Sequence, residues 1–298
     1  MTVAVAERFE ARIRRDEPMS RHTSWHVGGP ADIFYTPADR TELGAFLRSL
    51  AAGTPVYWVG LGSNLLVRDG GIRGVVISTQ GTLDRLERLS EGTVYSEAGT
   101  ACARIAKHCI RWGLGPAEFF AGIPGTLGGA LAMNAGAFGG ETWRHVLEVE
   151  TIDRHGREHR RAAAEYRVGY RQVDAPVGGE WFVAATLRFE KRPMAHEREM
   201  SELLDRRRAS QPIGEWSCGS VFTNPPADHA ARLIEAAGLK GCAVGGASVS
   251  SKHANFIINH GNATAADIET LIERVREAVE RAHGVRLHPE VRIVGEAA

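Results

Sequence analysis

The stretch Val56-Tyr-Trp-Val-Gly-Leu-Gly-Ser-Asn64 decides the fold of this 298-residue chain, because a short buried strand runs directly into a glycine-rich turn. Glycine lets a turn bend sharply and brings its N–H groups close to an anion, and Ser63 and Asn64 add short polar groups. Where a Rossmann unit would carry its third glycine the chain has Leu65, and it continues as a strand instead of a helix. The loop therefore indicates a phosphate cradle of another architecture, with a ligand-free tight hairpin as the alternative.

A second glycine-rich loop follows about 60 residues later. It reads Ala121-Gly-Ile-Pro-Gly-Thr-Leu-Gly-Gly-Ala130 and continues as Met133-Asn-Ala-Gly-Ala137. An uncharged, buried loop of this kind would leave many backbone groups unsatisfied unless a polar ligand lies against it. A large cofactor with a pyrophosphate and a flat ring would satisfy them. The uncharged run from 119 to 140 also imitates a membrane span, but its glycines and proline favour a loop packed inside protein.

The composition excludes several classes of protein. The 36 basic and 36 acidic residues give a formal net charge of zero, which argues against nucleic acid or an anionic membrane as partner. A hydrophobic content of 43% argues against disorder. The four cysteines form no C-x-x-C pair and no metal-like spacing, and the N-terminus is charged where a signal peptide would be apolar. We therefore expect a soluble, cytoplasmic protein with no metal site.

Periodicity and capping signals predict the main elements. One helix follows the capping box Asp39–Glu42 and ends at Gly53, and a second covers 101–112 with Gly113 as terminator. The last helix begins at Thr264-Ala-Ala-Asp267 and ends at Gly284. Two further helices are expected, at 194–210 and after Pro225-Pro226 as far as Gly238. Apolar runs predict strands at 56–59, 75–78, 146–152, 181–189 and, by alternation, 285–294. A change of texture places a domain boundary near residue 192.

Five motifs in order resemble the UDP-N-acetylenolpyruvoylglucosamine reductase family, in its compact subclass. They span nearly the whole chain, and the glycine loops among them are shared with wider flavin-binding families of the vanillyl-alcohol-oxidase type. The segments from 218 and 287 are the specific ones. The motifs are His22-Thr-Ser-Trp-His-Val-Gly-Gly-Pro-Ala-Asp32, Gly60-Leu-Gly-Ser-Asn-Leu-Leu-Val-Arg-Asp69, Ala121-Gly-Ile-Pro-Gly125, Cys218-Gly-Ser-Val-Phe-Thr-Asn-Pro225 and Leu287-His-Pro-Glu-Val-Arg292.

The resemblance implies an α+β fold, with a two-lobed FAD-binding region of the vanillyl-alcohol-oxidase/PCMH type over 1–192, split near residue 80. A C-terminal α+β substrate domain would cover 193–298. It implies that NADPH reduces non-covalently bound FAD and that UDP-N-acetylglucosamine enolpyruvate is then reduced to UDP-N-acetylmuramate for peptidoglycan. Hydride would go to the vinyl carbon and a proton to the carbon that bears the carboxylate. The expected protein is a monomer or weak homo-oligomer.

The resemblance also assigns the catalytic residues. Arg171, in Val168-Gly-Tyr-Arg-Gln172, matches the family's arginine, and its guanidinium suits the carboxylate on which charge develops. Arg167 is the alternative for this role. Glu290 is the expected carboxylate partner, against the reading that its side of the strand is merely solvated. Ser220 is the expected proton donor, although a serine in such a sequence is more often a strand-edge residue.

Binding residues follow from the same match. Val173 and Thr223 stand where the family has a serine and often a lysine. For the sugar nucleotide the match indicates Asn224, Lys252 and Arg292. For FAD it indicates the loop residues Gly60, Gly62, Ser63, Asn64, Gly122, Ile123, Gly125, Thr126 and Asn134. Two other functions compete: an oxidase of the same FAD-binding superfamily, and a non-catalytic nucleotide-binding regulator on the same scaffold.

Overall fold

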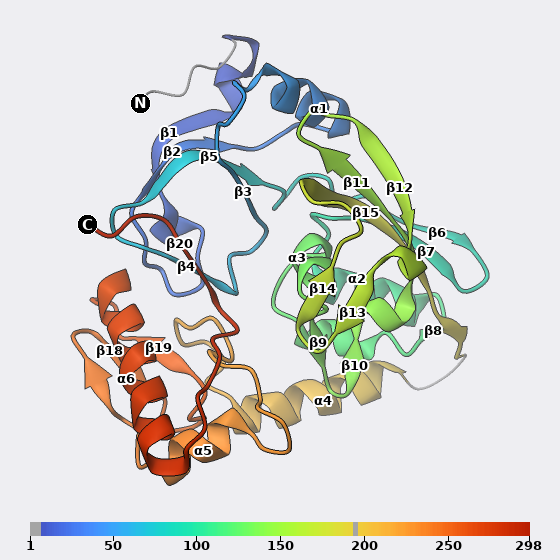
Figure 1. The fold of residues 1–298 in the computed structure, drawn as a ribbon. Helices are drawn as coiled ribbons and strands as arrows, with labels where there is room; N and C mark the ends of the chain where they lie inside the picture. The colour runs from blue at the N-terminus through green and yellow to red at the C-terminus, as the bar shows by residue number, and fades with distance from the viewer. Residues whose placement is uncertain (1–6, 193–195) are drawn as a thin grey trace. The chain divides into compact units, whose positions relative to one another are not determined.

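The computed structural model describes residues 7–192 and 196–298, which form two compact units (Figure 1). Unit 1 comprises the described residues of Phe34–Leu61 and Val76–Arg206 together with those before Arg15. Unit 2 comprises Arg15–Ile33, Gly62–Val75 and Arg207–Ala298. The chain therefore crosses from one unit to the other several times, and each unit is described below by itself.

One four-stranded sheet contains three of the five points where the chain crosses. Its order is β1-β2-β5-β3, from Ile13–Pro18, Pro30–Tyr35, Ile72–Ser78 and Val56–Val59. These three boundaries fall inside β1, β2 and β5, and the other two follow Leu61 and Arg206. The expected strands at 56–59 and 75–78 are confirmed as β3 and the end of β5.

Unit 1 is built on an antiparallel sheet of order β12-β11-β15-β7-β6. Across it, Arg161, Val149, Ala185, Ser96 and Leu86 lie in one row of pairs. The helices α2 and α3 lie beside this sheet (Figure 1), and they share a buried core with its apolar side chains. The strands are β6 Leu86–Ser90, β7 Thr93–Glu97, β11 Val146–Asp153, β12 Glu158–Ala162 and β15 Glu180–Arg188, and the helices are α1 Arg40–Ser49, α2 Cys102–Arg111 and α3 Leu127–Ala132.

The glycine-rich loop of unit 1 folds into short pieces, which explains its lack of a usable period. Its buried members include Phe120, Leu127 and Leu131, so the expected packing inside protein is confirmed. The pieces are β8 Leu114–Gly115, η3 Glu118–Gly122, β9 Gly136–Ala137, β10 Gly140–Glu141 and η4 Thr142–His145. After η5 Ala163–Glu165, the hairpin of β13 Arg167–Gly169 and β14 Gln172–Asp174 follows, and β16 Glu190–Lys191 pairs with β8.

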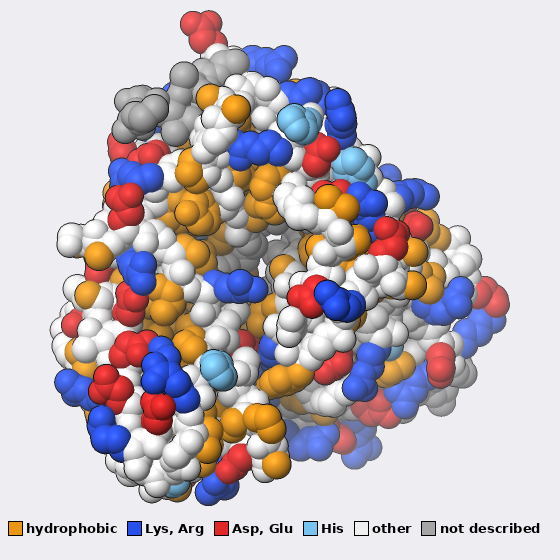
Figure 2. Space-filling model, viewed as in Figure 1, with side chains coloured by type: hydrophobic (Ala, Val, Ile, Leu, Met, Phe, Trp, Pro, Cys, Tyr) orange, Lys and Arg blue, Asp and Glu red, His pale blue; other side chains and the backbone are white. Residues whose placement is uncertain are grey.

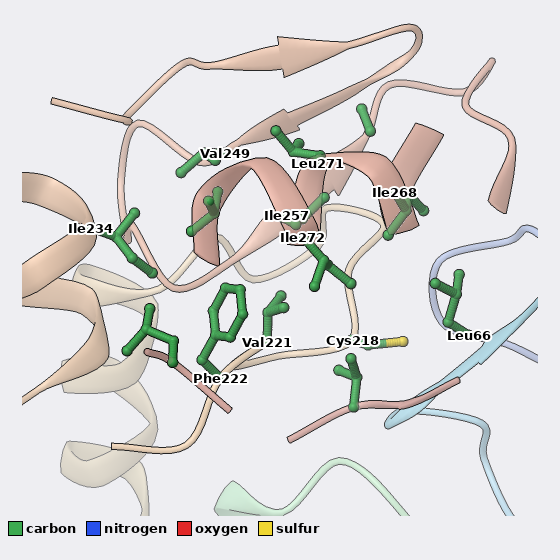
Figure 3. Packing of buried hydrophobic residues seen from close by; sticks show 14 of the residues in the cluster. Leu66, Cys218, Val221, Phe222, Ile234, Val249, Ile257, Ile268, Leu271 and Ile272 are labelled. Carbon is green, nitrogen blue, oxygen red and sulfur yellow. The ribbon is translucent and has the colours of Figure 1, made fainter. Parts of the chain in front are cut away.

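Unit 2 packs around the helix α6, Ala265–His283. Ile272 points from α6 toward Val221, as Figure 3 shows, and Ile268 and Leu271 belong to the same buried cluster. Thr264 and Asp267 form the expected capping box, and Gly284 ends the helix at φ 67°. The other helices are η2 Met19–Arg21 and α5 Ala230–Ala236, with the small sheet β17 Ala243–Val244, β18 Ala247–Val249 and β19 Ile257–Asn259.

The segment 285–294 is only partly the strand that alternation predicts. The strand β20 covers Arg292–Val294 and runs parallel to β4, Leu65–Val67. Before it the burial still alternates, with Leu287 and Val291 buried. Pro289 has no N–H to donate to a ladder, and it makes only an isolated bridge with Phe222. The prediction of a strand over 285–291 is therefore wrong, while its two faces are right.

The remaining helix predictions hold except for one terminus. Asp39 caps α1 by accepting from Glu42 N, 2.8 Å away, as expected. The helix ends at Ser49, so Gly53 is not its C-cap; it lies at φ 84° in the following turn. In the described residues, the helix expected at 194–210 is present as α4, His196–Ser210, and the helix expected after the proline pair is present as α5.

Charge is dispersed over the one face that Figure 2 shows. On the face shown in Figure 2, acidic and basic side chains are interspersed, without a large area of one sign. None of the helices in the described residues is long and apolar enough to cross a membrane. The expected domain boundary near residue 192 separates an FAD-binding part from a substrate-binding part, and it stays a prediction.

Candidate active site

Unit 1 contains a cavity of about 230 Å³ at the end of β3. The strand β15 and the helix α3 contribute to the same walls. Among its lining residues are Trp58, Gly60, Thr126, Gly129, Glu180 and Trp181. The cavity therefore joins residue 60 of the first glycine-rich loop to residue 126 of the second.

Two buried polar groups mark this cavity as a site for a polar ligand. Neither Trp58 Nε1 nor Thr126 Oγ1 has a hydrogen-bond partner among the described residues. Buried groups of this kind normally have one, so a ligand with acceptors is expected here. The Trp58 and Trp181 rings stack with centroids 5.4 Å apart and so offer a flat apolar wall. A Cβ on Gly60 would stand 2.3 Å from Thr126 Oγ1, so a side chain at this position would displace that of Thr126.

The second glycine-rich loop is anchored to the start of α2. Cys102 N donates to Gly125 O at 2.9 Å, and Ala101 makes an isolated β-bridge with Thr126. Gly122 ends η3, and Ile123, 8% exposed, follows as its C-cap. These four predicted cofactor residues, Gly122, Ile123, Gly125 and Thr126, are thus held in one well-connected segment.

In unit 2 the rest of the first loop lies against the predicted catalytic glutamate. Ser24 N donates to Gly62 O at 3.2 Å. Asn64 Nδ2 donates to Glu290 O at 3.1 Å, and Arg292 N donates to Asn64 O at 3.0 Å. Asn64, predicted as a cofactor residue, therefore bonds to the backbone at Glu290 and again at Arg292.

Ser220 and Glu290 come from neighbouring segments of unit 2. Glu290 N donates to Val221 O at 2.7 Å, which places residue 290 beside the backbone that follows Ser220. The buried Asn255 holds the same backbone, because its Nδ2 donates to Phe222 O and its Oδ1 accepts from Phe222 N. No pattern in the sequence indicates this structural role. Nearby, burial raises the pKa of the Cys218 thiol to about 12, so this thiol stays protonated.

Arg171 lies in unit 1, in the two-residue turn between β13 and β14. Its φ is 56°, a left-handed conformation that is uncommon for a residue with a side chain. Its Nη2 donates to Gly136 O at 3.4 Å. The alternative, Arg167, begins β13 and pairs with Asp174 at the far end of the hairpin.

The other predicted site residues differ in how far they are buried and in what they contact. Asn134 is 3% exposed, and its amide bonds to protein on both sides. Asn224 is exposed, and its Oδ1 accepts from Ala230 N at the start of α5. Lys252 donates from Nζ to Arg208 O, and the Arg292 side chain is exposed. None of these arrangements tests the predicted roles in binding.

Sequence reasoning missed much of the cavity wall. Trp58 is part of the quoted opening stretch, and its place two residues before Gly60 was the signal that could have found it. Trp181 and Glu180 begin β15, and no feature of the sequence links them to residue 58. Trp58 and Trp181 meet between strands of two different sheets, β3 and β15.

Comparison with known families matches both parts of the chain. Residues 31–161 match the FAD binding domain, and residues 211–294 match the UDP-N-acetylenolpyruvoylglucosamine reductase C-terminal domain. The first match covers Gly60, Gly122 and Thr126, and the second covers Ser220 and Glu290. These matches bear out the expected fold class, an FAD-binding region followed by a C-terminal α+β domain.

Full-length relatives agree with the family matches. The chain is 63% identical to UDP-N-acetylenolpyruvoylglucosamine reductase of Alkalilimnicola ehrlichii, over 96% of this chain and 95% of that protein. It is 60% identical to the enzyme of the same name from Methylococcus capsulatus, over 94% and 92%. The crystal structure of the reductase from Thermus caldophilus superposes with a TM-score of 0.78 at 32% identity, over 98% of this chain and 99% of that one. The chain therefore belongs to the UDP-N-acetylenolpyruvoylglucosamine reductase family and is an FAD-containing oxidoreductase.

Proposed function

We propose that this enzyme uses NADPH to reduce UDP-N-acetylglucosamine enolpyruvate to UDP-N-acetylmuramate, a precursor of peptidoglycan. In this proposal residues 1–192 bind FAD and residues 193–298 bind the sugar nucleotide. The observation that carries it is the bond from Glu290 N to Val221 O, which places residue 290 beside the backbone that follows Ser220. Both belong to the segment that matches the reductase C-terminal domain.

The cavity of unit 1 suits part of the FAD. The unpartnered Trp58 Nε1 and Thr126 Oγ1 would donate to cofactor acceptors, and the Trp58–Trp181 wall would contact a ring. We assign the other contacts to the predicted loop residues Gly60, Gly62, Ser63, Asn64, Gly122, Ile123 and Gly125. Any contact from Asn134 would use its backbone, since its amide already bonds to protein. When bound, FAD supplies the hydride that reaches the vinyl carbon of the substrate. The attachment is non-covalent.

Arg171 would act on the substrate carboxylate. Adding hydride to the CH₂ carbon turns it into a methyl group and drives negative charge onto the carboxylate next to the other carbon. A guanidinium with two parallel donors stabilises that charge better in the transition state than in the substrate. Its place in a tight turn on a hairpin gives it a defined backbone.

Ser220 would give its proton to the carbon that bears the carboxylate, which completes the saturated product. Glu290, as the protonated acid, would donate to the same carboxylate from the other segment and so polarise it. Serine is a weak acid, so the step needs a strongly basic carbon and a hydroxyl held in place. The bonds from Asn255 and Glu290 hold the backbone of residues 221 and 222, which directly follows Ser220. Asn224, Lys252 and Arg292 are the proposed contacts to the sugar nucleotide.

The proposal is tested by following the flavin colour. Purified protein should be yellow, NADPH should bleach it, and the enolpyruvyl sugar nucleotide should restore the colour. We expect Ser220→Ala and Arg171→Ala to slow this reoxidation by roughly a hundredfold or more. Ser248→Ala is the matched control in unit 2 and should react normally. Rapid reoxidation by dioxygen with none by the sugar nucleotide would instead identify an oxidase.

A further inference from the structure

The predicted cofactor residue Asn134 contacts the hairpin that carries Arg171. The residue is 3% exposed, and its Nδ2 donates to Gly169 O at 3.0 Å. Gly169 is the last residue of β13 and pairs with Gln172 directly across the turn Tyr170–Arg171. The amide thus holds the closing pair of the turn and not its outer end.

The same short segment makes a second contact with the turn. Two residues after Asn134, Gly136 O accepts from Arg171 Nη2 at 3.4 Å. One bond fixes the backbone on which Arg171 sits, and the other touches its guanidinium. Because the two bonds come from residues 134 and 136, a shift of this segment would move both ends of the arginine.

Asn134 is itself held firmly. Its Oδ1 accepts from Trp143 N at 3.1 Å, and its Nδ2 lies 3.5 Å from Glu141 Oε2. Trp143 is anchored by its Nε1, which donates to Leu131 O, and its ring lies 4.7 Å from that of Tyr166. The backbone of Asn134 has φ 47°, a conformation that asparagine tolerates better than most residues. These contacts join the hairpin to the buried part of unit 1.

We propose that Asn134 is a positioning residue: its amide holds the β13–β14 turn so that Arg171 presents its guanidinium to the substrate carboxylate. This inference rests on the proposed role of Arg171 and adds a residue that acts through it. A bond to the closing pair of a two-residue turn restricts both turn residues, since their backbone has few degrees of freedom. Placing a charged group within a fraction of an ångström is what such support provides in catalysis.

The test is a double-mutant cycle with Asn134→Asp and Arg171→Ala. Asp keeps the acceptor for Trp143 N and tolerates the same φ, but it removes the donor to Gly169 O. Each variant, loaded with FAD and reduced anaerobically by dithionite, is mixed with UDP-N-acetylglucosamine enolpyruvate while flavin absorbance is recorded. We expect N134D to slow reoxidation by about ten- to a hundredfold. In the R171A background the same change should cost less than about twofold, because non-additivity marks residues that act together.

A purely structural role gives a different pattern. It would lower FAD content and slow flavin reduction by NADPH as well as reoxidation, whereas we expect both to stay near wild type in N134D. Asn259→Asp is the control, since Asn259 is also buried and also bonds backbone on two sides, from Nδ2 to Trp25 O and from Gly261 N to Oδ1, in unit 2. Its reoxidation rate per flavin should match wild type. Equal slowing by N134D in both backgrounds, or none in either, overturns the inference; a fully active R171A overturns the proposed function instead.

Discussion

At the scale of single residues, the packing of the chain itself requires a glycine at position 62 of the first loop. A Cβ on Gly62 would lie 1.9 Å from His22 O, and the residue has φ 68°. The carbonyl belongs to backbone, so it cannot turn aside as a side chain could. The tight turn is therefore a packing requirement within unit 2 before any cofactor is considered.

We predict that Gly62→Ala destabilises the protein by about 3 kcal/mol or more, because overlap with backbone adds to the left-handed strain. Gly241 has φ 77°, and no atom lies within 4 Å of the position that a Cβ would take there. Gly241→Ala therefore introduces left-handed backbone strain without steric overlap, and it should lower the free energy of unfolding by about 1 kcal/mol. Urea unfolding of both variants measures the difference. Equal losses would show that residue 22 moves away freely.

The Glu180 carboxylate, at the start of β15, supplies a pH-dependent stabilisation at the same scale. Glu180 has a 7% exposed side chain, accepts from Thr151 Oγ1 and pairs with Arg161 at 2.6 Å. The hydrogen bond from Arg161 is the main cause that holds the pKa of Glu180 below its usual range. Because the folded pKa is lowered, the contribution is present above the unfolded pKa of about 4.3 and is lost as the pH falls through the folded value.

We therefore predict that Glu180→Gln lowers the free energy of unfolding by about 1–2 kcal/mol at neutral pH. The difference from wild type should shrink as the pH falls below about 4. Urea unfolding at a series of pH values measures it. Glu165→Gln removes a more exposed carboxylate beside the same arginine and should change stability less. A difference that grows toward low pH would contradict the sign.

At the scale of elements, the start of α6 shows how a helix end can depend on distant sequence. Thr264 Oγ1 accepts from Asp267 N, the bond that a local capping box provides. The two preceding N–H groups, of Ala265 and Ala266, both donate to the Asp69 carboxylate at 2.9 Å. A negative charge at this end is also favoured by the helix dipole. Asp69 thereby joins the loop after β4 to the main helix of unit 2.

Asp69→Ala should lower the free energy of unfolding by about 2 kcal/mol, since two N–H groups lose a charged acceptor. Asp69→Asn should lose less, because its one oxygen still accepts. Asp84→Ala, which breaks an exposed pair with Arg104, is the control and should change stability by under about 0.5 kcal/mol. Denaturant titration compares the three variants. A loss in D69A no larger than that in D84A would contradict the prediction.

The same elements show what the sequence could and could not predict. The ends of α6 and the start of α1 were readable, because caps and terminating glycines are local signals. The strand β12, Glu-His-Arg-Arg-Ala, was missed because it has no apolar alternation and depends on pairing with β11. The helix end at Ser49 and the break at Pro289 went against local patterns. Asp69 was quoted as part of a motif, but only the folded chain reveals its partner on α6.

For the site, the sequence predicted which residues belong to it better than which residues they contact. Ser220 and Glu290 were named from motifs, and the structure places their segments side by side. Asn134 was expected to contact cofactor, yet its amide reaches the turn before Arg171, through a bond that spans 35 residues. Spacing along the chain carries no information about such contacts, because they arise when loops of separate elements pack together.

At the scale of the whole molecule, cofactor binding and stability are coupled. A ligand that binds only the folded chain stabilises it in proportion to the logarithm of its concentration. We predict that FAD at about a hundred times its dissociation constant raises the free energy of unfolding of the apoprotein by about 2.7 kcal/mol. Thermal unfolding at increasing FAD concentration measures this, with FMN, which lacks the adenylate, as a weaker control. A melting temperature that does not depend on FAD would contradict it.

The parallel pairing of β20 with β4 has a consequence for synthesis on the ribosome. Leu65–Val67 emerges about 230 residues before its partner Arg292–Val294. At roughly 5–20 residues per second, the earlier strand waits about 10–45 seconds for its partner to be translated. Throughout that time an apolar edge has open backbone groups, which is the state that chaperones recognise and that other nascent chains can capture. Slow translation of the codons for residues 68–291 would prolong this exposure, so the rate at which this interval is translated influences how much of the chain matures.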